Sequence, residues 1–268
     1  MTPDDFAFIT GLIRGRTGFV LTRDKAYIIE NRLGPVVRRH RLKGVPELIA
    51  AVREGAEDLA GEVLDSMMTK DTGFFRDWKP FVHLRDENLR DLSHARVRDK
   101  SVRILCAGVS TGQEAYSAAL TVLESGWFMS DWNVDIIGID LSVSALAVAA
   151  RAAYTQFEVQ RGLPIQVLAH HFTKQDDAWL LDDAVRRMVE FKTWNLLADL
   201  TPFGRFDVVM CRNVLAYFDL QSKAAVLRNL ARLLPKDGRL YLGAAETPSG
   251  VTDGFRTVDA ALAVYAPN

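Results

Sequence analysis

Two glycines separate an apolar run from a helical pattern, at a point where the chain could turn sharply against a ligand. Gly108 and Gly112 follow the apolar run 102–107, with Ser110 and Thr111 between them. Glycine allows left-handed backbone and close approach to a ligand, and the free amides that open a helix attract polar groups. This turn predicts a nucleotide or nucleoside pocket, although a tight turn without a ligand fits the same residues. It matches neither G-x-G-x-x-G nor the P-loop, which disfavours dinucleotide and triphosphate sites.

An acidic residue, Asp140, follows the next apolar run, 134–139, which we interpret as a strand. In doubly wound folds an acid at this place commonly accepts both hydroxyls of a ribose. Asp140 could instead cap the helix predicted at 143–153. Because the glycine turn precedes it in the chain, ribose binding is the favoured interpretation.

A third polar group, Arg212, Asn213 and Tyr217, follows the predicted strand 206–211. Open parallel sheets bind ligands at this carboxyl edge. The four-residue step from Asn213 to Tyr217 is helical spacing, which predicts that both side chains turn to one side. Alternatively, Asn213 satisfies loop backbone and Tyr217 is half-buried core.

Arg76 lies at the junction between an amino-terminal helical region and the strands, directly after Phe74 and Phe75. The two phenylalanines can be a packing wedge between domains, with the arginine solvated. Arginine also grips carboxylates with two parallel hydrogen bonds, so Arg76 is a candidate clamp for a substrate or cofactor.

Other reactive side chains predict less chemistry. The five histidines show no metal-ligand spacing, so we expect no metal site. Cys106 and Cys211 both lie in apolar runs, which predicts buried thiols and a reducing, cytoplasmic setting. No signal-peptide pattern and no apolar run long enough to span a membrane is visible, so we expect no membrane insertion.

The elements that must position these residues fall into two regions. Residues 1–66 show helical periodicity, with Pro35 expected to end or bend a helix, and 67–80 form a linker that contributes to the site. Residues 81–268 alternate short apolar runs with helical periods, which predicts an α/β domain with a parallel sheet covered on both faces. The pattern breaks over 160–190, which indicates an insertion. The remaining strands are predicted at 188–192, 239–243 and 262–266, with helices at 114–123 and 221–234.

The composition is that of a globular protein: 268 residues, 49% hydrophobic and 25% charged. A formal net charge of -1 disfavours a whole-chain nucleic-acid binder. The charge is uneven, however, since nine Lys or Arg residues but only two acids lie between positions 14 and 43. Any contact with a polyanion must therefore be local.

Four separated segments, 72–76, 107–117, 138–140 and 211–219, together resemble the CheR-type chemoreceptor glutamate methyltransferases, which use S-adenosylmethionine. Segments 25–33, 161–164, 194–197 and 234–246 support the resemblance, which covers nearly the whole chain. It implies a Rossmann-like methyltransferase domain, a small all-helical amino-terminal domain and a small antiparallel β insertion. The implied reaction is methyl transfer from S-adenosylmethionine to receptor glutamates, leaving S-adenosylhomocysteine.

The same resemblance implies roles for individual residues. The cofactor pocket would be lined by Thr72, Arg76, Gly108, Glu114, Asp140, Asn195, Leu196, Arg212 and Asn213, with Asp140 on the ribose. Arg76 and Tyr217 would lie nearest the reacting groups and are the implied catalytic residues. The basic face with Arg38, Arg39 and Arg41 would dock on the acidic methylation helices of the receptor.

The sequence also departs from the family. Gln113 stands where members often carry Glu, Ala115 where they often carry Pro, and Lys70 replaces a polar residue near the cofactor. The insertion lacks the glycine-containing loop of members that recognise a receptor's carboxyl-terminal pentapeptide, so we expect pentapeptide independence. A non-catalytic cofactor-binding scaffold and a nucleic-acid methyltransferase remain the alternatives, the latter supported only by the basic stretch.

Overall fold

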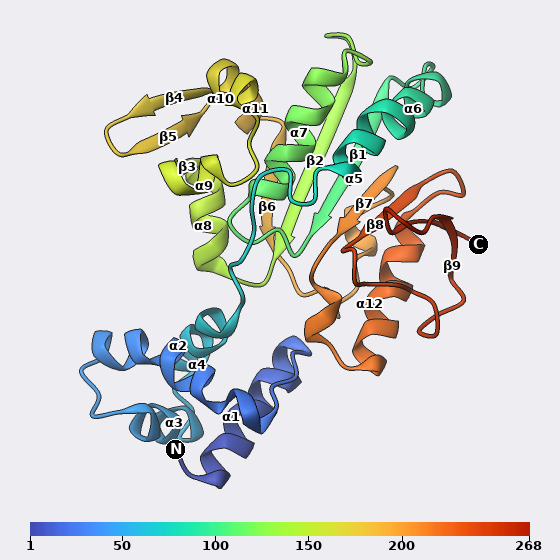
Figure 1. Ribbon diagram of the computed structural model, residues 1–268. Coiled ribbons are helices and arrows are strands. Elements are labelled where there is room, and N and C mark those ends of the chain that lie inside the picture. Colours follow the sequence, from blue (N-terminus) through green and yellow to red (C-terminus); the bar gives the residue numbers. More distant parts are fainter.

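The computed structural model describes residues 1–268 apart from the side chain of Lys25, and its amino-terminal part is a bundle of helices (Figure 1). The helices are α1 (Pro3–Thr17), α2 (Ala26–Arg39), α3 (Val45–Arg53) and α4 (Glu57–Met67), with a short 3-10 turn, η1 (Arg23–Lys25), before α2. Thr2 starts α1 by accepting a hydrogen bond from the Asp5 amide at 3.1 Å, and Gly18 ends it with a left-handed φ of 76°. Pro35 does not end α2, which continues to Arg39.

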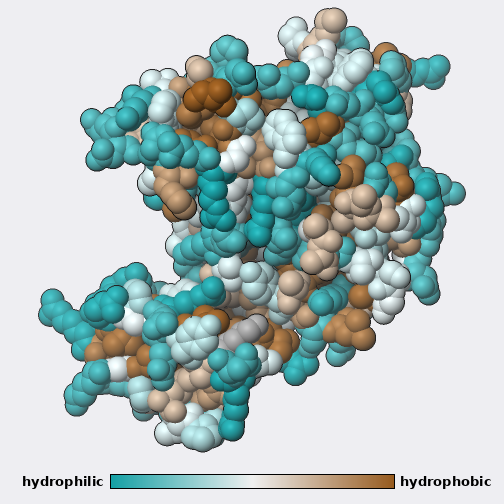
Figure 2. All heavy atoms as spheres, viewed as in Figure 1, coloured by the Kyte–Doolittle hydropathy of each residue, from teal (hydrophilic) through white to brown (hydrophobic). Residues whose placement is uncertain are grey.

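The helical domain has its own apolar core, built from one face of each helix, and apolar atoms are visible between its helices in the space-filling view (Figure 2). It is formed mainly by Ile9, Ile13, Ile29, Leu33, Val36, Leu48, Ile49, Val63 and Met67. The apolar side chains recur at three- and four-residue steps, so they gather on one side of each helix. Partly buried Phe19 and Leu141 extend this core toward the larger domain.

A seven-stranded sheet organises the larger domain, in the order β6-β2-β1-β7-β8-β10-β9. Its strands are β1 (Ser101–Ala107), β2 (Asn133–Asp140), β6 (Val189–Thr193), β7 (Val208–Cys211), β8 (Arg239–Leu242), β9 (Phe255–Asp259) and β10 (Val264–Pro267). The pairs among β6, β2, β1, β7 and β8 are parallel, whereas β10 runs antiparallel to both of its neighbours. The predicted doubly wound α/β fold is confirmed.

Helices cover both faces of the sheet, which explains the continuous apolar runs in the sequence. Along β1, Ile104 and Cys106 join one core with α5 (Lys79–His83), α6 (Leu89–Ala95) and α7 (Gln113–Ser125). Leu105 and Ala107 join the opposite core with α12 (Leu220–Leu233). Side chains alternate along a strand, so both sets are buried at once.

A small antiparallel sheet packs beside this domain and matches the predicted β insertion in kind. It has the strand order β3-β5-β4, from β3 (Ala153–Thr155), β4 (Phe172–Gln175) and β5 (Ala178–Leu181). The short helices α9 (Gln156–Gln160) and α10 (Ile165–His171) connect β3 to β4, and α8 (Val143–Arg151) leads into the small sheet. After β5, the short helix α11 (Asp183–Arg186) leads back to β6 of the large sheet. The first strand of the small sheet, β3, lies before residue 160.

The start of the larger domain, before β1, contains more helix than the sequence indicated. After the linker, α5 continues through a five-residue π-helical turn, η2 (Leu84–Asn88), into α6. Two short 3-10 turns, η3 (Thr201–Phe203) and η4 (Leu215–Tyr217), flank β7. Among the described helices, none is both long and apolar enough to cross a membrane.

Candidate active site

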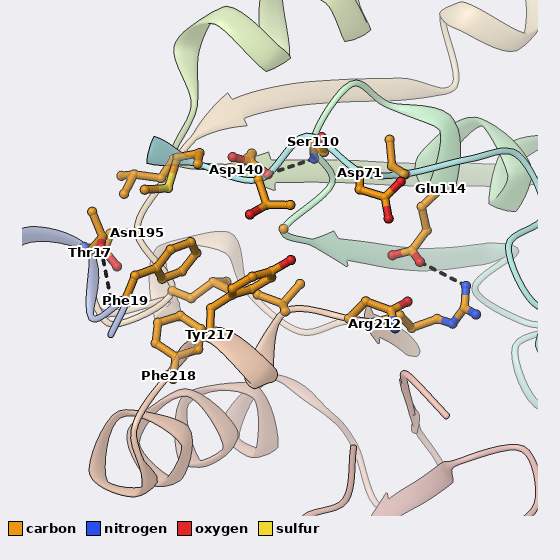
Figure 3. A pocket seen from close by; sticks show the side chains of 18 of the residues that line it. Thr17, Phe19, Asp71, Ser110, Glu114, Asp140, Asn195, Arg212, Tyr217 and Phe218 are labelled. Atoms are coloured by element: carbon orange, nitrogen blue, oxygen red, sulfur yellow. Dashed lines mark hydrogen bonds and ion pairs between the residues drawn. The ribbon is translucent and has the colours of Figure 1, made fainter. Parts of the chain in front are cut away.

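The candidate site lies at the carboxyl end of the parallel strands, beside β1. The chain leaves β1 toward β2 and β6 and later returns on the other side of β1 as β7, so the connections diverge at this edge. Such a switch point opens a crevice in a doubly wound sheet. A cavity occupies it, closed on one side by residues of the helical domain, and all ten residues predicted for the site line it. Figure 3 labels five of them, Glu114, Asp140, Asn195, Arg212 and Tyr217.

The glycine turn is built for close approach. Gly108 has a φ of 75°, and a Cβ placed on it would lie 2.5 Å from Val214 Cγ2, so only glycine fits. The amides of Gly108 and Val109 both donate to the Ile139 carbonyl, at 2.8 and 3.1 Å. Ser110, although not glycine, also has a left-handed φ of 53°. The turn is thereby fastened to the end of β2.

Asp140 presents its carboxylate between this turn and α8. Its oxygens accept from the Ser110 amide and the Ser142 amide, each at 2.8 Å, which leaves further acceptor positions on both oxygens. Ser142 caps α8 by accepting from the Ala145 amide, so Asp140 is not the helix cap. Burial raises the pKa of Asp140, although hydrogen bonds from Ser142 and Ser110 oppose the rise.

Arg212 and Glu114 form a buried ion pair at the inner end of the cavity. Arg212 Nη1 lies 3.2 Å from Glu114 Oε2, and Arg212 Nη2 donates to the Arg76 carbonyl and to Asp77 Oδ2, both at 2.7 Å. Glu114 lies in the first turn of α7. Its pKa is raised because burial outweighs the attraction of Arg212. Arg212 thus ties the linker to the start of α7.

Asn213 lines the cavity because of the shape of its loop, not because of a helical step to Tyr217. The predicted helical step from Asn213 to Tyr217 is wrong, because Asn213 has a left-handed φ of 60° and only Leu215–Tyr217 form a 3-10 turn. The Asn213 amide donates to Glu246 Oε2 at 2.8 Å, and the Ala216 amide donates to Glu246 Oε1 at 3.2 Å. Glu246, buried behind the loop, therefore sets its shape.

Tyr217 reaches the cavity from the outer side of the same loop. Its ring stacks on Phe19 of the helical domain, with centroids 5.2 Å apart, and its hydroxyl points into the cavity (Figure 3). The Val20 amide donates to the Tyr217 carbonyl at 3.0 Å, and Phe19 forms a β-bridge with Phe218. The side chain is 37% exposed, so a substrate can reach it.

Arg76 lies where the linker passes the cavity. Its Nη1 donates to the Asp71 carbonyl at 3.1 Å, and its Nη2 lies 3.7 Å from Asp71 Oδ2. Asp71 also pairs with Arg161 at 3.0 Å. Arg76 is partly exposed and held loosely, which leaves its guanidinium able to contact a carboxylate.

The other predicted residues form the walls. Thr72 lines the cavity from the linker, and buried Leu196 supplies an apolar surface. Asn195 lines it too, but its side chain donates to the Arg16 carbonyl at 2.8 Å and accepts from the Leu197 amide at 3.0 Å. Asn195 therefore also joins the two domains.

Several lining residues were not predicted from the sequence. They are Thr17, Phe19, Met68, Thr69, Asp71, Gly73, Leu141, Trp194, Val214 and Phe218. Thr17 ends α1 and Phe19 follows it, far from the other motifs in the chain, and nothing in their local pattern marks them. Leu141 and Val214 directly follow predicted site residues and could have been included.

Three buried polar atoms of lining residues indicate the kind of ligand that fits. Ser110 Oγ, Arg212 Nε and Asn213 Oδ1 have no hydrogen-bond partner among the described residues. An unpaired buried polar group costs about 1–3 kcal/mol, so a ligand that pairs with them is favoured. With the Asp140 carboxylate and the apolar walls, these groups fit a nucleoside that carries a charged, polar tail.

Fold and site together define a class of enzyme. A doubly wound sheet with the single reversed strand β10 next to its edge, and a glycine turn and an acid at its switch point, is the arrangement of S-adenosylmethionine-dependent methyltransferases.

Within that class, residues 70–264 match the CheR methyltransferase, SAM binding domain, and residues 4–68 match the CheR methyltransferase, all-alpha domain. The chain belongs to the CheR methyltransferase family, and the predicted family, enzyme class and cofactor are confirmed.

Curated relatives agree over nearly their whole length. The chain is 32% identical over 262 residues to the chemotaxis protein methyltransferase of Vibrio parahaemolyticus, covering 96% of this chain and 94% of that protein. It is 34% identical over 253 residues to chemotaxis protein methyltransferase 1 of Vibrio cholerae, covering 92% and 90%. For the chemotaxis protein methyltransferase of Escherichia coli the identity is 32% over 262 residues, covering 93% and 86%.

Proposed function

We propose that this enzyme methylates glutamate side chains of chemoreceptors, the methyl-accepting chemotaxis proteins, and forms glutamate methyl esters in chemotaxis adaptation. The observation that carries the proposal is that the helical domain and the methyltransferase domain build one cavity together. Similarity to chemotaxis protein methyltransferases over both domains supports the same substrate class.

The residues around the cavity suit S-adenosylmethionine. Asp140 would accept the ribose hydroxyls, Gly108 would leave room for the nucleoside, and Glu114 would face its ammonium group. Thr72, Arg76, Asn195, Leu196, Arg212 and Asn213 would complete the lining. The cofactor supplies a methyl group on a sulfonium, which an anionic oxygen can attack directly.

The reaction requires little acid–base catalysis from the protein. A glutamate side chain with an ordinary pKa of about 4.3 is already anionic at neutral pH, so no general base is required. The site must align the carboxylate and exclude water that would solvate it. We assign to Arg76 the orientation of the substrate carboxylate, and to the Tyr217 hydroxyl a hydrogen bond to its second oxygen.

The direct test is incubation with labelled S-adenosylmethionine and membranes that contain chemoreceptors. We expect label on the receptor that mild base releases as methanol, because methyl esters hydrolyse in base. Label that resists base, or no label on any receptor, would contradict the proposal.

A non-catalytic scaffold with the same pocket is the second candidate, and the residues that favour it are Gln113 and Lys70. Gln113 accepts from Thr111 Oγ1 at 2.7 Å, and Lys70 lies beside Ser144 at 2.5 Å. Calorimetric binding of S-adenosylhomocysteine without methyl transfer to any receptor would establish the scaffold. Methyl transfer at any measurable rate, if mutation of Tyr217 reduces that rate, would exclude the scaffold.

The receptor would dock on the exposed arginines Arg38, Arg39 and Arg41 at the end of α2. Arg39 already pairs with Glu62, so an acidic helix would compete with an internal partner there. The triple charge reversal R38E/R39E/R41E should raise the KM for receptor and leave cofactor affinity unchanged. Reversal of the exposed Arg228, Arg232 and Arg256 of the other domain is the matched control. An unchanged KM would remove this face from the contact.

We also propose that methylation does not require a receptor pentapeptide. Only Asp176 and Asp177 join β4 to β5, so the small sheet has a two-residue turn and no long loop there. Receptors with and without their last five residues should be methylated at equal rates. A rate that falls on truncation would show that another surface binds the tail.

A cytoplasmic location belongs to the same proposal. The cysteines Cys106 and Cys211 are buried and free, and receptor methylation helices lie on the cytoplasmic side. Cell fractionation would test it, and recovery of the enzyme outside the cytoplasm would contradict it.

A further inference from the structure

The carboxylate of Asp65, near the end of α4, reaches from the helical domain to the first turn of α8. Its Oδ1 accepts from Ser142 Oγ at 2.8 Å and from the Ser144 amide at 3.1 Å, and its Oδ2 accepts from Ser144 Oγ. The Lys70 ammonium lies 3.7 Å from Asp65 Oδ2. Three polar groups from the other domain and the Lys70 ammonium of the linker thus converge on one carboxylate.

The contact completes the amino-terminal cap of α8. The first amides of a helix lack partners within it, and a negative charge near them is stabilised by the helix dipole. Ser142 Oγ accepts from the Ala145 amide at 3.1 Å, which leaves the Ser144 amide for Asp65. Ser142, the residue before the helix, therefore caps the Ala145 amide, and Asp65 of the other domain caps the Ser144 amide.

The same serine connects Asp65 to the cofactor site. The Ser142 amide donates to Asp140 Oδ1 while the Ser142 hydroxyl donates to Asp65 Oδ1, both at 2.8 Å. Leu141, between Asp140 and Ser142 in the chain, lines the cavity and packs on the helical domain's core. Moving Asp65 would therefore move the residue that holds Asp140.

We infer that Asp65 is a positioning residue for the cofactor: by capping α8 across the domain boundary, it fixes the Asp140 carboxylate and couples the placement of the helical domain to cofactor affinity. The inference rests on the proposed role of Asp140. Coupling between binding and domain placement is reciprocal, so cofactor binding also stabilises the position of the helical domain.

Asp65 is negatively charged while it caps α8. Burial alone would raise the pKa of Asp65, but hydrogen bonds from Ser144 and Ser142 and the charge of Lys70 outweigh it, so the pKa is lowered. The negative charge of Asp65 in turn adds to the burial that raises the pKa of Asp140. The other charged groups beside or across the cavity from Asp140 are Lys70, Asp71, Arg76, Glu114 and Arg212.

Calorimetric binding of S-adenosylhomocysteine tests the inference on the full chain. D65A removes every acceptor and should raise the Kd about tenfold. The matched control D58A changes an exposed acid on the same helix and should leave the Kd within about twofold. D65N retains an oxygen that can accept from Ser142 and Ser144 and should bind nearly as well as wild type at neutral pH.

The pH dependence separates positioning from simple stabilisation. Because D65N removes a negative charge near Asp140, the acid midpoint of its binding curve should move to lower pH than in wild type. A purely structural role would leave that midpoint unchanged. Wild-type affinity in D65A, or an unshifted midpoint in D65N, would overturn the inference alone. Failure of the wild-type chain to bind would overturn the proposed function as well.

Discussion

Replacement of Asp140 by asparagine removes one charge from the end of β2 and keeps the size of the side chain. A hydrogen bond to a charged group contributes about 1.5–3 kcal/mol, and a ribose would donate two of them to this carboxylate. An amide oxygen retains part of that interaction, so we expect a net loss of about 2–4 kcal/mol. The Kd for S-adenosylhomocysteine should rise about 30- to 700-fold.

The same replacement should leave the fold intact. Burial raises the pKa of Asp140, so the folded protein favours the neutral form relative to the unfolded chain. That contribution to stability is present in acid and is lost as pH rises through the raised pKa. At neutral pH the relief of this buried charge opposes the loss of one amide hydrogen bond, because an asparagine has only one acceptor oxygen for the Ser110 and Ser142 amides. The Tm should therefore stay close to that of wild type.

Acid titration provides a second measurement. As pH falls through the raised pKa of Asp140, the carboxylate takes a proton and cofactor affinity should fall. Glu114, whose pKa burial also raises, contributes to the same decline, so D140N should retain only that part. Calorimetry from neutral pH to about pH 4.5, on wild type and D140N, measures the contributions of Asp140 and Glu114 to the loss of affinity. D135N, on the same strand and paired with Arg103 at 2.8 Å, is the control. If D140N binds as tightly as wild type at neutral pH, Asp140 does not hold the ribose.

Three further substitutions test other walls of the cavity. Y217F removes the hydroxyl that points into the cavity, so turnover should fall about 10- to 100-fold while the Kd for S-adenosylhomocysteine stays within about twofold; equal turnover would exclude the assigned role. G108A places a Cβ 2.5 Å from Val214 and should cost about 2–4 kcal/mol, seen as a Tm lower by about 5–10 °C, with V214A restoring part of it. F19A removes the ring stacked on Tyr217 and should lower kcat more than it weakens cofactor binding, with F19Y near wild type; an unchanged kcat would show that the stack is dispensable.

The central sheet was predictable because burial on both faces leaves uninterrupted apolar runs. β1, β2 and β7 each lie within about two residues of the predicted strands. β9 was missed because only Phe255 of its five residues is buried, so the strand shows no alternating pattern. β3 has three residues and provides too little pattern to identify.

The lining of the candidate cavity was predictable where its residues directly follow strands. Gly108, Asp140 and Arg212 come just after or at the ends of β1, β2 and β7, and parallel strands bring their carboxyl ends to one edge. Phe19 reaches the same cavity only because the helical domain packs against the loop of Tyr217. That contact depends on tertiary packing between segments about 200 residues apart, which no local periodicity encodes.

Backbone strain and unpaired polar atoms occur together in this cavity. Ser110 and Asn213 both have left-handed backbones, with φ of 53° and 60°, and both carry a buried polar atom without a partner among the described residues. Such a backbone costs about 1–3 kcal/mol per residue and persists only where its surroundings fix it. Here Asp140 holds the Ser110 amide and Glu246 holds the Asn213 amide, each at 2.8 Å. These contacts stabilise the strained backbone already in the free protein. Ligand binding therefore does not have to supply the energy of that strain, and more of the contact energy remains as affinity.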